Sequence, residues 1–172
     1  EYHKWKFTAK WYTPLTRSTE ENPRKLVLHT NVGLGFFGSY NNDIGLSPFE
    51  RFYLGGVFLS GFVLEGRELV NLRGYDDLAV TFPNPNTGSP VIAKYGAELR
   101  YPLSTHPNAT IYALTFLEAG NTWSKLNDFN PFEVNRSAGV GLRIFLPMFG
   151  LLGLDYGWRF DDIPQAPQMA NG

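Results

Sequence analysis

Hydrophobic and polar residues alternate along most of this chain with a period of two. The alternation is clearest in six runs, at 3–11, 26–36, 93–101, 111–123, 137–146 and 152–160. Strict alternation over such lengths indicates β-strands, because successive side chains of a strand point to opposite faces. No segment shows a competing period of 3.6 residues over a useful length. The sequence therefore predicts an all-β chain built from about six long strands.

The two faces of these predicted strands differ in a way that bears on their surroundings. One face consists almost wholly of large apolar side chains, and the other mixes glycine with charged residues. Aromatic residues stand towards the strand ends, as in the girdles of outer-membrane barrels: Trp5, Trp11, Tyr101 and Trp158. Runs of about 10 to 15 residues are near the 9–11 that cross a bilayer when tilted. These features favour an antiparallel transmembrane β-barrel over a soluble β-sandwich, which alternation alone does not exclude.

The composition narrows the class of protein further. The 172 residues are 43% hydrophobic but only 18% charged, below the roughly 25% usual for soluble domains, and the net charge is −1. A nucleic-acid binder would carry a basic surplus. The lack of cysteine excludes disulfide scaffolds, thiolate metal sites and cysteine catalysis. No apolar run reaches the roughly 18 residues of a membrane helix, so helical spanning is excluded.

Five connections of unequal length join the predicted strands, at 14–25, 41–90, 102–109, 124–136 and 147–150. Outer-membrane barrels have short periplasmic turns and long outside loops, so the second and fourth connections should lie outside. Both ends of the chain would then also lie outside, whereas barrel termini normally lie in the periplasm. We therefore expect residues 1–172 to be a partial outer-membrane barrel domain, an interior piece with no periplasmic domain. The absence of a signal peptide before Glu1 agrees with a fragment.

The connection at 41–90 is too long to be an idle link, because ordered loops above about 12–15 residues tend to be functional. Its segments Phe52–Gly56 and Phe58–Leu64 are too apolar to stay in water. It then reaches Leu72–Tyr75, in the order Leu-Arg-Gly-Tyr. An arginine followed by glycine and an aromatic residue can present its guanidinium at a tight turn, since glycine permits positive φ. The alternative is an exposed turn with a solvated arginine.

In their order and spacing, these motifs resemble the BamA family. That family has a Gly-Gly element, a spacer and an Arg-Gly-aromatic loop tip. The corresponding loop residues here are Gly55, Gly56, the long spacer 59–70, Leu72, Arg73, Gly74 and Tyr75. Further matches follow in the family's order: Glu98–Pro102, Phe116–Trp123, Arg136–Arg143, Leu146–Pro147 and Gly150–Gly153. The resemblance covers nearly the whole chain, and it implies that the six strands correspond to the tenth to fifteenth of a sixteen-stranded barrel.

The resemblance also implies a role for the loop tip. In the family, the long loop folds back into the lumen and its arginine contacts acidic residues of the inner wall. By position, Arg73 should meet Glu98, Glu118 or both. Glu98 falls on the polar face of its strand, whereas Glu118 shares a face with apolar residues such as Phe116. The alternative is that the two carboxylates only keep the lumen hydrated.

A BamA-like identity implies an outer-membrane assembly factor with no covalent chemistry. Such a protein receives unfolded β-barrel precursors from the periplasm, helps them insert into the lipid bilayer, and works with accessory lipoproteins. Three alternatives remain from the residues alone. They are a transporter for two-partner secretion, a porin-type channel whose long loop constricts the pore, and a soluble β-sandwich binding module.

Other candidate sites are weaker. The paired aspartates at 76–77 and 161–162 suggest calcium, but neither pair has the ligand spacing of a calcium loop. The histidines lie far apart without a Glu-x-x-His pattern: His3, His29 and His106. No serine stands in a Gly-x-Ser-x-Gly elbow, and no glycine-rich phosphate loop precedes a helix. We therefore expect no catalytic residue, no metal and no cofactor.

Overall fold

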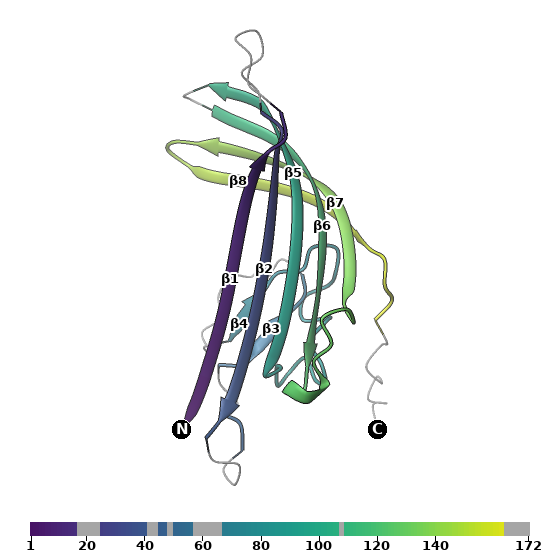
Figure 1. Cartoon of the computed structure of the whole chain (residues 1–172). Helices are drawn as coiled ribbons and strands as arrows, with labels where there is room; N and C mark the ends of the chain where they lie inside the picture. Colours follow the sequence, from purple (N-terminus) through teal and green to yellow (C-terminus); the bar gives the residue numbers. More distant parts are fainter. Residues whose placement is uncertain (17–24, 41–44, 48–49, 57–66, 107–108, 164–172) are drawn as a thin grey trace, which may run out of the picture.

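One antiparallel sheet of six long strands dominates the computed structural model, which describes residues 1–16, 25–40, 45–47, 50–56, 67–106 and 109–163. The strand order across the sheet is β1-β2-β5-β6-β7-β8 (Figure 1). The bounds of these strands are Tyr2–Pro14 for β1, Val27–Ser39 for β2, Val91–His106 for β5, Ala109–Trp123 for β6, Asn135–Leu146 for β7 and Gly150–Arg159 for β8. The sheet is open between β1 and β8, and the predicted all-β, antiparallel fold is confirmed.

Among the described residues, three short elements lie between the long strands. Strands β3 (Phe52–Leu54) and β4 (Glu68–Val70) pair in parallel inside the long connection. A single 3₁₀ turn, η1 (Leu126–Asp128), lies in the connection between β6 and β7. None of the helical residues that the structure describes forms a segment long and apolar enough to cross a membrane.

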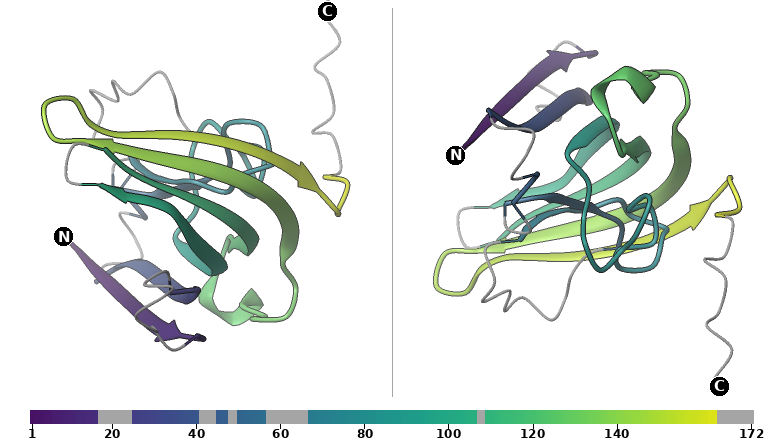
Figure 2. Two further views of the ribbon diagram at one scale, coloured as in Figure 1. Left: turned by 90° about the horizontal axis from the view of Figure 1, so that it is seen from above. Right: turned by 90° about the horizontal axis from the view of Figure 1, so that it is seen from below.

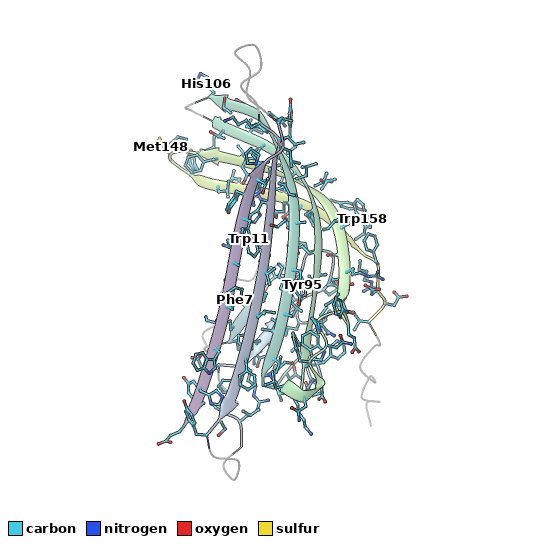
Figure 3. All side chains as sticks on the ribbon, in the orientation of Figure 1. Phe7, Trp11, Tyr95, His106, Met148 and Trp158 are labelled. Atoms are coloured by element: carbon cyan, nitrogen blue, oxygen red, sulfur yellow. The ribbon has the colours of Figure 1, made fainter. Side chains whose placement is uncertain are left out.

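The register of the sheet keeps the two predicted faces separate. The partner of Trp5 is Phe36, and the partner of Val140 is Tyr156, so large apolar side chains meet across neighbouring strands on the outer face. No other part of the described chain covers these outer side chains: Leu154 is 70% exposed and Tyr156 is 72% exposed. Figure 3 shows the side chains along both faces of the sheet. No second sheet covers the outer face within the described ranges, whereas a β-sandwich would bury that face against one.

The predicted boundary of the third connection is wrong. Strand β5 does not end at Pro102 but continues to His106, and β6 begins at Ala109. The register shifts between Pro102 and Ser104, which leaves Leu103 without a partner in β6. A bulge of this kind accommodates proline, because proline has no N–H to donate to the neighbouring strand. The strand therefore passes through the proline that the sequence suggested as its end.

The hydrophobic core lies between the sheet and the long connection. Figure 2 shows that the sheet is curved and that β3, β4 and the chain after them lie on its concave side. Buried residues from both partners form the core: Phe37 and Ile92 from the sheet, and Phe52, Leu54, Leu72, Tyr75 and Val80 from the connection. Parts of the connection, including the apolar run Phe58–Leu64, lie outside the described residues. The buried side chains of the connection pack against the wall, whereas Asn71, Asp76 and Asp77 are exposed.

Candidate functional site

Arg73 lies at the centre of the candidate site, where the loop tip meets the concave face of the sheet. Its Nη2 donates to Oε1 of Glu98 at 2.6 Å and to Oε1 of Glu118 at 2.7 Å. All three residues are buried, with exposed fractions of 8% for Arg73, 8% for Glu98 and 5% for Glu118. The structure therefore brings together the arginine and both acidic residues that the resemblance singled out, and it leaves none of them in bulk water.

Glu118 holds the backbone of the loop as well as the guanidinium. Its Oε2 accepts the backbone N–H of Arg73 at 2.8 Å, and its Oε1 accepts Nε of the same residue at 3.1 Å. Lys94 lies 3.2 Å from Glu118 Oε1 and donates to the backbone carbonyl of Asn71. One carboxylate from β6 and one ammonium from β5 thus fix both the side chain and the main chain of the tip.

Further charges continue the network across the sheet. Arg100 donates to the second oxygen of Glu98 and lies 3.0 Å from Nδ1 of His29. On the other side, Nη1 of Arg73 lies 3.7 Å from Oδ2 of Asp155, which also receives Arg143 at 2.7 Å. Arg73 is therefore surrounded by carboxylates from three strands, β5, β6 and β8. Each of these carboxylates has a second cation of its own.

The guanidinium of Arg73 also stacks on an aromatic ring. Its Cζ lies 3.8 Å from the centroid of Phe116, two residues before Glu118 on the same face of β6. Burial alone lowers the pKa of Arg73, but hydrogen bonds and charge attraction from Glu118 and Glu98 outweigh burial and raise the pKa above its ordinary value. The arginine stays charged, and cation–π contact with Phe116 adds to the ion pairs.

Gly74 allows the tip to lie directly on the wall. Its φ is +89°, a conformation that residues with a Cβ rarely adopt. A Cβ at Gly74 would lie 3.1 Å from Cβ of Ser137 and 3.1 Å from the backbone carbon of Trp158. Gly157 of β8 lies opposite Gly74, and a Cβ at Gly157 would lie 3.1 Å from the backbone nitrogen of Gly74. The main chain of the loop and the main chain of β8 are thus in contact.

Tyr75 fixes the tip to the next strand. Its ring is buried, and its hydroxyl donates to the backbone carbonyl of Arg136 in β7 at 2.8 Å. The Arg136 side chain makes two hydrogen bonds to Asp161, which follows β8. The three residues of the Arg-Gly-Tyr tip therefore contact different parts of the wall. Arg73 contacts β5, β6 and β8, Gly74 contacts β7 and β8, and Tyr75 contacts β7.

The Gly-Gly element supports the tip from behind. Gly55 and Gly56 have φ of +141° and +49°, and a Cβ on Gly55 would lie 2.6 Å from the backbone oxygen of Asp76. The backbone N–H of Leu72 donates to the carbonyl of Gly56 at 3.0 Å, and the Leu72 side chain is fully buried. The spacer separates the two halves of the signature in sequence, but the fold brings them into contact.

Other parts of the loop are tied to the sheet far from Arg73. Thr122 of β6 donates to the carbonyl of Val80 at 2.9 Å and accepts the backbone N–H of Phe82 at 2.8 Å. At the opposite side of the sheet, Lys4 of β1 lies 2.7 Å from Glu68 and 3.0 Å from Glu50. The loop is therefore attached from β1 to β8, across the full width of the sheet.

Sequence reasoning missed several members of this site. Lys94 and Asp155 stand on the polar faces of their strands, so the alternation contained a signal for them. Phe116 gave no such signal, because an inward aromatic ring is explained only by the loop that covers it. The part of the chain that the structure describes contains no cluster of three His, Asp or Glu able to hold a metal ion. What the arrangement does chemically is to hold the loop in place with buried ion pairs and main-chain contacts.

Comparisons with known proteins agree with this architecture. The model of the Omp85 superfamily domain matches residues 1–168. Among solved structures, the chain is similar to BamA from Haemophilus ducreyi lacking POTRA domains 1–3, with a TM-score of 0.63 and 19% sequence identity. The match covers 94% of this chain and 32% of that chain, so the present chain spans about a third of the structure it resembles. No curated protein matches the chain.

Proposed function

Because this chain belongs to the Omp85 superfamily, and is thus part of a bacterial outer-membrane β-barrel, we propose that the complete protein is an assembly factor for other β-barrels. It receives unfolded barrel precursors from the periplasm and helps them fold into the bilayer. The obstacle to this process is physical: unpaired backbone N–H and C=O groups each cost several kcal/mol in hydrocarbon. The factor lowers that barrier without making or breaking a covalent bond.

The observation that carries the proposal is the attachment of the loop to the lumenal wall. Arg73 binds Glu98 and Glu118 where the side chains are almost fully buried. A buried pair is a weak source of net stability, but losing one partner is costly, so its value lies in fixing one geometry. We infer that the braced wall keeps its shape while strands elsewhere in the complete barrel separate to admit a precursor.

The test is assembly in a defined membrane. The full-length protein is placed in lipid vesicles, a urea-unfolded outer-membrane β-barrel precursor is added, and folding is followed by the precursor's resistance to protease and to SDS. We expect folding faster than in empty vesicles, with the gain lost in the R73A variant and partly kept in R73K. A rate equal to that of empty vesicles would contradict the proposal.

Matched controls separate assembly from damage. The substitution K125A changes an exposed residue outside the site and should leave the folding rate unchanged.

Transport of a secreted passenger in place of precursor folding would assign the protein to two-partner secretion. A large, steadily open conductance would assign it to a porin-type channel. Accessory lipoproteins are expected to copurify with the full-length protein after mild detergent extraction.

A further inference from the structure

The turn between β7 and β8 has an unusual composition for a turn. From Ile144 to Leu154 the chain carries no charged residue. Gly150 supplies the positive φ that the turn needs, with φ of +84°. The tip itself, however, consists of Met148 and Phe149, which are 92% and 80% exposed. Turns that stand in water normally place polar residues such as Asn, Asp or Ser at such positions.

The hairpin is apolar on both faces next to this turn. Ile144 pairs with Leu152 on the outer face. Phe145 pairs with Leu151. Because Phe145 is two residues after the inward-facing Arg143, it lies on the same face, which is polar elsewhere in the sheet. Phe145 is 45% exposed and Leu151 is 56% exposed. A hairpin end beside a water-filled lumen would carry polar residues on its inner face.

The neighbouring strand ends behave differently. At the same edge of the sheet, β5 ends in Ser104, Thr105 and His106, which are polar. Figure 3 labels His106 and Met148, and Met148 lies nearer than His106 to the loop-covered end of the sheet. In Figure 1, β7 and β8 also lean away from the direction of β1. In the register of the sheet, Phe145 pairs with Thr110, which in turn pairs with Thr105. The apolar turn and the polar end of β5 therefore lie at the same edge of the sheet and differ in composition.

The length of β8 agrees with this position. Ten residues at about 3.4 Å each span about 34 Å, and a tilt of about 45° reduces their height to about 24 Å. The apolar band of an outer-membrane barrel is about 25 Å tall. Arg159 and the Arg136–Asp161 pair mark the opposite, polar end of the hairpin. With that end at the membrane surface, the turn lies at the opposite boundary of the hydrocarbon.

We propose that the side chains of the β7–β8 turn insert into the periplasmic leaflet of the outer membrane, with lipid acyl chains around Met148 and Phe149. The turn backbone stays at the headgroup boundary, where water can pair its N–H and C=O groups. The occupant follows from continuity: Leu152, Leu154 and Tyr156 form the exposed lipid-facing surface of β8, and the turn extends that surface without interruption. The inference rests on the barrel's place in the outer membrane and is independent of the assembly activity, so each can fail alone.

Depth measurements in the bilayer test the proposal. The full-length protein, with any cysteines outside this cysteine-free chain replaced, receives a single cysteine by M148C, F149C or T105C. Each is labelled with a nitroxide, and the protein is reconstituted in vesicles of phosphatidylethanolamine and phosphatidylglycerol. We expect the labels at 148 and 149 to be accessible to oxygen and shielded from a water-soluble nickel complex. The label at 105 should show the reverse, because it stands at the polar end of β5.

Two results would overturn the proposal. One is a nickel accessibility at 148 and 149 equal to that at 105, which would place the turn in water. The other is protection from both reagents that appears only when an unfolded precursor is added, which would make the turn a docking site for a client chain. The two neighbouring labels guard against one variant that fails to fold, and heat-modifiable migration in SDS gels verifies that each barrel is folded.

Discussion

Glu118 uses both of its carboxylate oxygens to hold Arg73, one on the guanidinium and one on the backbone N–H. A carboxylate that only kept the lumen hydrated would not bind the main chain of a loop residue that is 45 positions away in sequence. The contact fixes the position of the loop tip as well as its charge. The following predictions test what this contact contributes.

Replacing Arg73 should destabilise the barrel strongly. The R73A variant leaves Glu118 and Glu98 buried beside fewer cations, and breaking such a pair costs about 3–5 kcal/mol. The R73K variant keeps the charge but loses the forked geometry of the guanidinium, so about 1–2 kcal/mol is expected. Urea unfolding of the full-length protein in vesicles measures both. Equal stability of R73A and wild type would contradict the account.

The two acidic partners should differ in importance. The E118Q variant weakens the bonds to the Arg73 side chain and main chain together, so we expect a loss of about 3 kcal/mol. The E98Q variant removes a charge whose other partner, Arg100, is partly exposed and can be rehydrated, so about 1–2 kcal/mol is expected. The same unfolding assay decides the order. A larger effect of E98Q than of E118Q would reverse our assignment.

These expectations also indicate how far the sequence alone could lead. The two-residue period determined the six strands and their faces, because lipid on one side and an enclosed interior on the other leave a strict alternation. It placed Glu98 on the inner face directly. It left Glu118 ambiguous, because Phe116 also points inward: the loop covers that part of the wall, and Arg73 stacks on the ring. Contacts made by a loop on a distant strand leave no local periodic signal.

Alanine at position 74 should destabilise the protein more than alanine at another glycine position that has the same backbone conformation. Alanine at φ of +89° costs about 1–2 kcal/mol from the conformation alone. Its Cβ would also press on Ser137 and on the backbone of Trp158, which should add at least about 1 kcal/mol. The control is G150A, because Gly150 has φ of +84° and nothing within 4 Å of an added Cβ. Equal losses in the two variants would mean that the tip does not touch the wall.

The order Arg-Gly-Tyr indicated a tight turn from its own residues, but only the resemblance to a family indicated what the Gly-Gly and Arg-Gly-Tyr elements contact. Gly56 is needed because Asp77 approaches it, and Gly157 is needed because Gly74 lies on it. Both reasons are tertiary contacts between segments separated along the chain. The boundary at Pro102 failed for a related reason, since pairing with β6 carried the strand through the proline.

Acid should weaken the outer end of the β7–β8 hairpin. Hydrogen bonds from Arg136 lower the pKa of Asp161 below its usual 3.8, so the carboxylate loses its proton more readily in the folded protein. Its contribution to stability is complete above about pH 4 and is lost as the pH falls through the lowered folded-state pKa. The difference in urea midpoint between wild type and D161N should therefore shrink from pH 6 to pH 2. A difference that stays constant over this range would exclude the ion pair as its source.

The central claim is that Arg73 and Glu118 hold the loop against the wall as a coupled pair, and a double-mutant cycle measures this most directly. Free energies of unfolding are determined for the full-length wild type, R73M, E118Q and the R73M/E118Q double variant in the same vesicles. We predict an interaction free energy of about 2 kcal/mol or more between the two residues, because each single substitution leaves its buried partner unpaired. A coupling close to zero would show that the two residues act independently, and the bracing of the loop would then have to be abandoned.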